Sequence, residues 1–123
     1  MTNTDKRILI IDPNYDECMV MASFIRSEGF AVETGSSLAD ALKLLNKDYY
    51  PCLIIDVDLP EMKGYEAVSI LKNIHPQVKI IMITKKNSRE LEAKVREQDI
   101  FFYFIKSFGK DELILAIHNA FNN

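Results

Sequence analysis

Five short apolar runs separated by longer amphipathic stretches constrain the fold of this chain more than any other feature. The runs fall at residues 8–11, 30–32, 53–55, 80–83 and 101–105. They are too short for helices, and their β-branched and aromatic residues favour strands. Several are apolar at consecutive positions, as expected of strands that are covered on both faces.

The stretches between these runs have the length and the periodicity of helices. Helices are predicted over residues 14–28, 37–47, 64–74, 88–98 and 110–121. In the first of them, Asn14 and Glu17 have the spacing of a capping box, and Gly29 stops the helix. The fourth is mostly charged and offers few side chains for burial, among them Leu91 and Val95.

This alternation of strand and helix, repeated five times, predicts an α/β fold with a parallel sheet and helices on both of its faces. Right-handed crossovers favour a flavodoxin-like (βα)5 sandwich with the strand order 2-1-3-4-5. A chain of 123 residues has room for a single domain, residues 1–123. Ligands of such folds bind beyond the carboxyl ends of the strands, so Asp12 and Asp56, which follow two of the runs, are expected at one edge.

Composition and charge narrow the classes of function. The net charge of −3 argues against a nucleic-acid-binding surface, because such surfaces need clustered Lys and Arg. Cys18 and Cys52 form neither a disulfide framework nor a zinc motif. No apolar stretch approaches the roughly 18–20 residues that cross a bilayer, and the polar start MTNTDKR has no signal-peptide pattern. A cytoplasmic location without membrane contact is therefore expected.

Polar residues follow four of the five predicted strands and form a candidate site. They are Asp12 after the first strand, Asp56 and Asp58 after the third, Thr84 after the fourth and Lys106 after the fifth. Carboxylates hold hard cations such as Mg²⁺, Thr and Lys contact phosphoryl oxygens, and a carboxylate can itself be a nucleophile. Taken singly, an aspartate after a strand is usually a turn or cap residue, Thr84 could cap the next helix, and Lys106 is more often a solvated side chain. Taken together, they indicate the chemistry of phosphoryl groups.

These residues and their surroundings resemble the receiver domain of two-component response regulators over nearly the whole chain. The resemblance is carried by ILIID, LIIDVDLPEMKGYEAV, IIMIT and YFIKSF, in that order. It implies that Asp56 is a phosphoacceptor that takes a phosphoryl group from a histidine kinase or a phosphotransfer protein. It also implies that Thr84 and Lys106 bind the phosphoryl oxygens, and that Tyr103 is an aromatic switch that turns as Thr84 moves.

The resemblance further implies a signalling module rather than an enzyme, with a metal ion and a partner surface. Mg²⁺ would be held by Asp12, Asp56 and the backbone carbonyl of Asp58. The signal would leave through the fourth helix, the fifth strand and the fifth helix. That face is the family's usual partner surface and a contact through which homodimers form.

The chain departs from the family pattern at three positions of this site. Pro13 stands where the family has a second acid that binds Mg²⁺, and proline offers neither a charge nor an N–H, so a weakened metal site is expected. Lys85 replaces a small residue, and its ammonium either points into solvent, obstructs the path to Asp56 or partly replaces the cation. Ser107 replaces a proline. A trans Lys106–Ser107 bond is expected, because a cis bond before a non-proline residue costs about 2.5–4 kcal/mol.

Two hypotheses within the family follow. Either the chain is a working receiver with weak Mg²⁺ affinity, or it is an atypical receiver that acts through protein contacts without phosphorylation. The side chain of Asp58 would either compensate for Pro13 by approaching the ion or repel an incoming phosphoryl group. Outside the family, DVDLP also resembles the DxD motif of haloacid-dehalogenase-type phosphatases, although that motif follows a first strand. A flavodoxin-type FMN carrier would need a phosphate loop where this chain has DPNYDE.

Overall fold

The structure, a computed structural model, describes residues 6–122. Residues 1–5, which make up most of the polar start on which the expectation of no signal peptide rests, and residue 123 lie outside the described residues. The strands are β1 (Arg7–Ile11), β2 (Ala31–Gly35), β3 (Cys52–Asp56), β4 (Lys79–Thr84) and β5 (Phe102–Ile105). They form one parallel sheet in the order β2-β1-β3-β4-β5, which confirms the predicted order.

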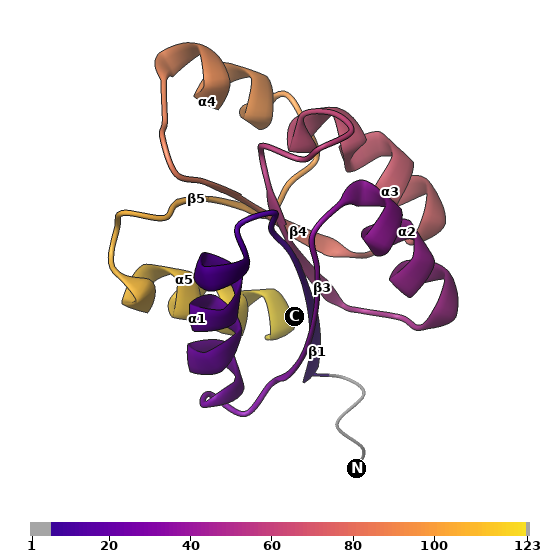
Figure 1. Ribbon diagram of the computed structural model, residues 1–123, viewed down its shortest axis with the longest axis vertical. Coiled ribbons are helices and arrows are strands. Elements are labelled where there is room, and N and C mark those ends of the chain that lie inside the picture. The colour runs from indigo at the N-terminus through magenta and orange to yellow at the C-terminus, as the bar shows by residue number, and fades with distance from the viewer. Residues whose placement is uncertain (1–5, 123) are drawn as a thin grey trace.

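The helices alternate with the strands, as the sequence pattern predicts. They are α1 (Tyr15–Arg26), α2 (Leu38–Lys47), the 3₁₀ helix η2 (Gly64–Ala67), α3 (Val68–Ile74), α4 (Arg89–Arg96) and α5 (Lys110–Phe121). Figure 1 shows α1 and α5 together on one side of the sheet and α2 and α3 together on the other, with α4 above them. No helix among the described residues is long and apolar enough to cross a membrane.

The core consists of two apolar layers, one on each face of the sheet. All five residues of β3 are buried, because this central strand is covered by helices on both sides. One layer joins β-strand side chains such as Leu53 to α2, α3 and Val95 of α4. The other joins side chains such as Ile54 to α1 and α5. Alternate residues of one strand therefore supply both layers.

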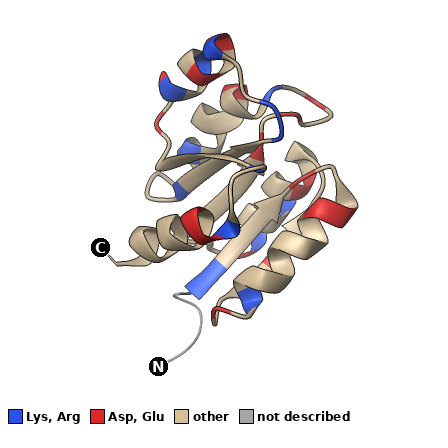
Figure 2. Cartoon of the chain, turned by 90° about the vertical axis from the view of Figure 1, so that its left-hand side faces the viewer, with Lys and Arg blue, Asp and Glu red and all other residues tan. Residues whose placement is uncertain are grey.

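The helix α4 differs from the others in how little of it is buried. Val95 is its one buried side chain, while acidic residues occupy its first turn and basic residues its last turn. In Figure 2 it is the uppermost helix, with both charge signs on its surface. This arrangement suits the helix dipole, but the hydrophobic attachment to the sheet is small.

Two helix ends show why the boundaries differ from the sequence prediction. The helix predicted over residues 64–74 begins as the 3₁₀ turn η2, since the N–H of Gly64 donates to the carbonyl of Val57 at 2.6 Å and ties this turn to the loop after β3. After α1, Gly29 has a φ of 97°, a conformation that glycine adopts without a steric penalty.

Candidate functional site

The parallel register brings the predicted polar residues to one edge of the sheet. Asp12 directly follows β1, Asp56 and Thr84 are the last residues of β3 and β4, and Lys106 directly follows β5. Neighbouring strands pair up to these ends, so the four side chains share the carboxyl edge. Asp12, Asp56 and Thr84 are also the buried polar side chains among residues 6–122.

The ammonium of Lys106 lies at the centre of three carboxylates. Its Nζ is 2.8 Å from Oδ2 of Asp12, 2.8 Å from Oδ2 of Asp56 and 2.8 Å from Oε1 of Glu17. The contact to Glu17 is a directed hydrogen bond. The contact to Asp12 is an ion pair only, because its buried Oδ2 accepts no hydrogen bond. Burial lowers the pKa of Lys106, but the three carboxylates outweigh it and raise that pKa overall, so the side chain is a stable cation.

The carboxylate of Asp56 is fixed through both of its oxygens. Oδ1 accepts a hydrogen bond of 2.7 Å from the N–H of Asp58, and Oδ2 faces Lys106. Burial raises the pKa of Asp56 above the ordinary aspartate value of 3.8, although the Lys106 ammonium and the Asp58 N–H oppose this rise. The result is a desolvated carboxylate held in one orientation, which is the arrangement that a carboxylate nucleophile needs.

The oxygen donors around Asp12 fit a divalent cation with few protein ligands. Among residues 6–122, no three His, Cys, Asp or Glu side chains are grouped so that they could hold a metal ion. The carboxylates of Asp12 and Asp56 remain, both buried, and Oδ2 of Asp12 lacks a hydrogen-bond donor. Such hard oxygen donors suit Mg²⁺, which keeps several of its waters in proteins.

The two side chains that the sequence left ambiguous, Asp58 and Lys85, pair with groups other than Asp12 and Asp56. Oδ1 of Asp58 pairs with Nζ of Lys63 at 2.7 Å, at an exposed position. Nζ of Lys85 lies 3.4 Å from Oε2 of Glu17, and the Lys85 side chain is 69% exposed. Lys85 therefore borders the site and contacts its outermost carboxylate, while Asp58 contributes its backbone.

Thr84 and Tyr103 belong to a second, separate set of contacts. The hydroxyl of Thr84 donates to the backbone carbonyl of Lys86 at 3.0 Å, and the hydroxyl of Tyr103 donates to Oδ1 of Asn87 at 2.6 Å. Both side chains are buried. The structure thus brings Asp12, Asp56 and Lys106 into contact, whereas Thr84 and Tyr103 are bonded to the loop between β4 and α4.

Glu17 is a site residue that the sequence analysis missed. The predicted capping box is half right: the side chain of Asn14 accepts from the N–H of Glu17 at 3.0 Å. The other half is wrong, because the N–H of Asn14 donates to Oδ1 of Asp12 at 2.9 Å and the Glu17 side chain turns to Lys106. The hydrogen bond from Lys106 lowers the pKa of Glu17, so this side chain is a carboxylate at neutral pH. The signal available in the sequence was Glu17 itself, an acidic residue four positions after Pro13 and close to the predicted site.

Glu61 was missed as well, and it fixes the loop that follows β3. Its two carboxylate oxygens accept hydrogen bonds of 2.9 Å from the backbone N–H groups of Leu38 and Ala39. These bonds lower the pKa of Glu61 and cap the first turn of α2. The loop after Asp56 is therefore tied to a neighbouring helix.

The described peptide bonds are all trans, as expected for Lys106–Ser107.

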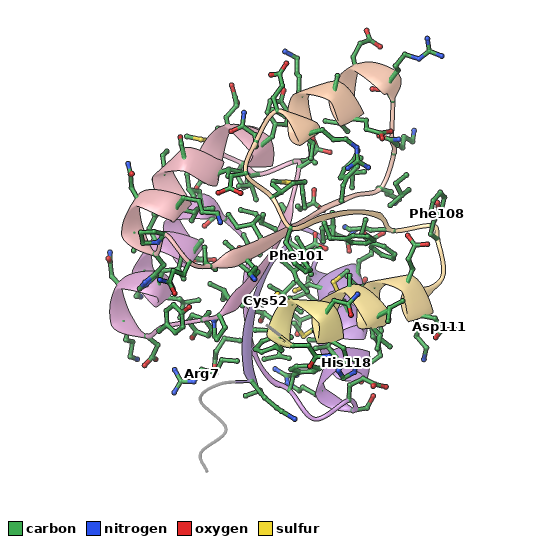
Figure 3. All side chains as sticks on the ribbon, turned by 180° about the vertical axis from the view of Figure 1, so that it is seen from behind. Arg7, Cys52, Phe101, Phe108, Asp111 and His118 are labelled. Carbon is green, nitrogen blue, oxygen red and sulfur yellow. The ribbon has the colours of Figure 1, made fainter. Side chains whose placement is uncertain are left out.

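A shallow cleft of about 320 Å³ opens beside Lys106. It lies between α1 and the loop that leads into α5, and its apolar lining includes Val20, Phe24 and Phe108. Figure 3 shows Phe108 on that loop, at the outer end of α5. Half of the Phe108 side chain is exposed.

The sequence profile of the response regulator receiver domain matches residues 8–118. The chain belongs to this family. The response regulator TodT of Pseudomonas putida is 32% identical over 120 residues, which cover 98% of this receiver and 53% of TodT. The transcriptional regulatory protein GlrR of Escherichia coli is 26% identical over 98% of this receiver and 27% of GlrR. The chain thus spans about half or less of the length of these relatives.

Solved receivers share the fold of this one. The beryllofluoride-activated NtrC4 receiver domain, solved as a dimer, has a TM-score of 0.88 at 24% identity, covering 94% of this chain and 96% of that chain. A Burkholderia pseudomallei response regulator, solved with a phosphorylated aspartic acid and a calcium ion, has a TM-score of 0.83 at 22% identity, covering 94% of this chain and 68% of that chain. At these identities the likeness concerns the fold.

Family membership makes the chain a non-enzymatic module of two-component signalling, in which receivers pair with histidine kinases and typically bind Mg²⁺. It also sets aside the phosphatase and FMN-carrier alternatives. The DxD sequence of the phosphatases follows a first strand, whereas Asp56 here ends the third strand of the chain.

Proposed function

We propose that this receiver accepts a phosphoryl group on Asp56 from a histidine kinase or a phosphotransfer protein. The observation that carries the proposal is the buried Asp56 carboxylate at the carboxyl edge of the sheet, 2.8 Å from the ammonium of Lys106. A carboxylate oriented beside a fixed cation is suited to attack phosphorus and then to share the phosphoryl charge. The phosphorylated aspartic acid of the Burkholderia pseudomallei relative supports the same chemistry.

The remaining residues then have distinct roles. Lys106 binds a phosphoryl oxygen, and Thr84 binds another once its hydroxyl leaves the carbonyl of Lys86, to which it donates in this structure. That exchange shifts the loop between β4 and α4, where Asn87 holds Tyr103. Phosphorylation therefore changes the populations of two arrangements of this loop and of the face formed by α4, β5 and α5.

A bound magnesium ion would supply positive charge that neutralises the phosphoryl oxygens. Asp12, Asp56 and the backbone carbonyl of Asp58 would hold it. Pro13 removes one anionic ligand, so the affinity for Mg²⁺ is lower than in a receiver with two adjacent acids.

The module, residues 1–123, is a single receiver domain that acts in the cytoplasm. Its partners are proteins, and its net charge of −3 does not suit nucleic acid. It forms homodimers through α4, β5 and α5, in line with the dimeric NtrC4 receiver.

The phosphoryl donor approaches over the cleft beside Lys106, where Val20 and Phe108 are exposed.

A second function in the same family, signalling through protein contacts without phosphorylation, is favoured by one observation. Lys106 already provides a cation for Asp12 and Asp56, and no three acidic side chains in residues 6–122 are grouped so that they could hold a metal ion. Because the Lys106 ammonium offsets the negative charge of the two aspartates, the site is stable without a metal ion or a phosphoryl group.

Intact mass after incubation with acetyl phosphate, with and without Mg²⁺, separates the two functions. The expected result is a phosphate adduct that requires Mg²⁺ and is lost in Asp56→Asn. No adduct even at high Mg²⁺ would overturn phosphorylation as the function and leave the second function.

Restoring the missing acid tests the explanation of the metal site. Pro13→Asp should raise the affinity for Mg²⁺ about tenfold or more, because it adds an anionic oxygen beside Asp12. Equilibrium titration with Mn²⁺, followed by electron paramagnetic resonance, measures this affinity directly. An unchanged affinity would mean that Pro13 is not what weakens the site.

A further inference from the structure

Glu17 completes the coordination of the Lys106 ammonium. An ammonium has three N–H donors, and three carboxylate oxygens lie 2.8 Å from Nζ of Lys106. The only one of the three carboxylates that meets directed hydrogen-bond geometry is that of Glu17. Three carboxylate oxygens therefore surround this ammonium, and a phosphoryl oxygen can take a place beside it only if one of them leaves.

Burial indicates which carboxylate leaves. The side chain of Glu17 is 33% exposed, against 0% for Asp12 and 8% for Asp56. Glu17 can exchange Lys106 for water, whereas the two aspartates would stay buried without a cation. Lys85, at 3.4 Å from the second oxygen of Glu17, offers that carboxylate another partner at the rim.

The backbone near Glu17 leaves its side chain free for this role. In a full capping box, the Glu17 carboxylate would accept from the N–H of Asn14. Here that N–H is taken by Asp12. Asn14 alone caps α1, so the Glu17 carboxylate projects from the first turn towards the sheet edge.

We propose that Glu17 is a positioning residue that holds Lys106 in the unphosphorylated state and competes with the phosphoryl group for its ammonium. This inference rests on the proposed phosphorylation of Asp56. The hydrogen bond between Glu17 and Lys106 stabilises the resting state and is given up when the phosphoryl oxygen binds. Glu17 thereby opposes activation, and its negative charge adds to the repulsion of an anionic phosphoryl donor.

Beryllofluoride, a stable phosphoryl mimic, tests the competition. Glu17→Gln removes the charge and keeps the shape, and it should bind beryllofluoride about three- to tenfold more tightly than the wild type at saturating Mg²⁺, as measured by ¹⁹F nuclear magnetic resonance. Asp16→Asn is the matched control, because Asp16 is an exposed acid on the same helical turn. The control should change the affinity less than twofold.

The outcomes separate this inference from the function on which it rests. Equal or weaker binding by Glu17→Gln, with clear binding by the wild type, would overturn the competition and leave the proposed function intact. Binding by Glu17→Gln alone would support the competition in its strongest form. No binding by either protein, together with no adduct from acetyl phosphate, would overturn the proposed function and the competition with it.

A double-mutant cycle measures the contact itself without any phosphoryl donor. Urea unfolding of the wild type, Glu17→Gln, Lys106→Met and the double variant should show a coupling of about fivefold in the unfolding equilibrium constant. Additive effects would mean that the two side chains do not hold each other in solution, and would overturn the inference. The Asp16→Asn and Lys106→Met pair should be additive.

Discussion

Charged groups are buried against one another at the ends of β1, β3 and β5. The segment that follows β4 makes few buried contacts with the rest of the protein. At the first place, which we call the acid end, Lys106 forms ion pairs with Asp12, Asp56 and Glu17. At the second, which we call the switch end, the loop is held by single hydrogen bonds, and the following helix α4 buries one side chain.

The difference teaches how one edge of a sheet can combine a fixed site with a movable element. Desolvated charges have few alternative partners, so the acid end has one strongly preferred arrangement. The switch end exchanges one hydrogen bond for another at little cost, because Asn87 and most of α4 are exposed to water, although Thr84 and Tyr103 are buried. A signal that begins at the acid end is therefore expected to appear as motion at the switch end.

The largest effect is expected from removing the cation of the acid end. Lys106→Met leaves Asp12 and Asp56 as buried like charges, so the free energy of unfolding should fall by about 3–5 kcal/mol. Urea denaturation followed by circular dichroism measures the loss. Lys86→Met, at the exposed switch end, should change stability by less than about 0.5 kcal/mol. Equal losses in the two variants would remove the contrast between the two ends.

The close packing of the loop after Asp56 gives the next largest effect. A Cβ at Gly64 would overlap the backbone carbonyl of Asp56, so Gly64→Ala should cost about 1–3 kcal/mol of unfolding free energy. Gly109→Ala is the control, since its Cβ would meet nothing and its φ of −61° suits alanine. Thermal unfolding of both variants tests this, and a tolerated Gly64→Ala would show that the loop yields easily.

A pH series isolates the charge of Asp56. Burial raises the pKa of Asp56 above 3.8, so its ionised form destabilises the fold at every pH above that raised pKa. Asp56→Asn should therefore stabilise the protein at neutral pH, by about 1 kcal/mol, the usual scale of single substitutions. The gain should shrink as the pH falls through the raised pKa and vanish below 3.8. A gain that is constant with pH would contradict the electrostatic origin.

The smallest effect belongs to the switch end. Tyr103→Phe removes the hydrogen bond to Asn87 and should cost about 0.5–1 kcal/mol. Chemical denaturation of Tyr103→Phe, Asn87→Ala and the double variant checks this, and the second substitution should add little once the first is made. A loss as large as that of Lys106→Met would show that the switch end is as firmly held as the acid end.

Much of this structure could be predicted from patterns of residue types. Strand order followed from the alternation of strands and helices, because crossover handedness leaves few parallel arrangements. The meeting of Asp12, Asp56 and Lys106 followed as well, since each comes directly after one of the apolar runs that predict strands. The 3₁₀ turn at Gly64 did not, because it depends on a contact with the carbonyl of Val57 in another segment.

The sequence by itself determined the fold class, the sheet edge on which the polar residues gather, and the family, because all three depend on local periodicity and on the order of short motifs. Only the tertiary structure decided which partner each charged side chain takes. Glu17 fits a local cap equally well in sequence, yet Asp12 occupies the N–H that this cap needs, and Lys106, distant in sequence, offers a buried cation. Burial and the three-dimensional meeting of charges settle such choices, since the strength of a charged contact depends on the solvent that surrounds it.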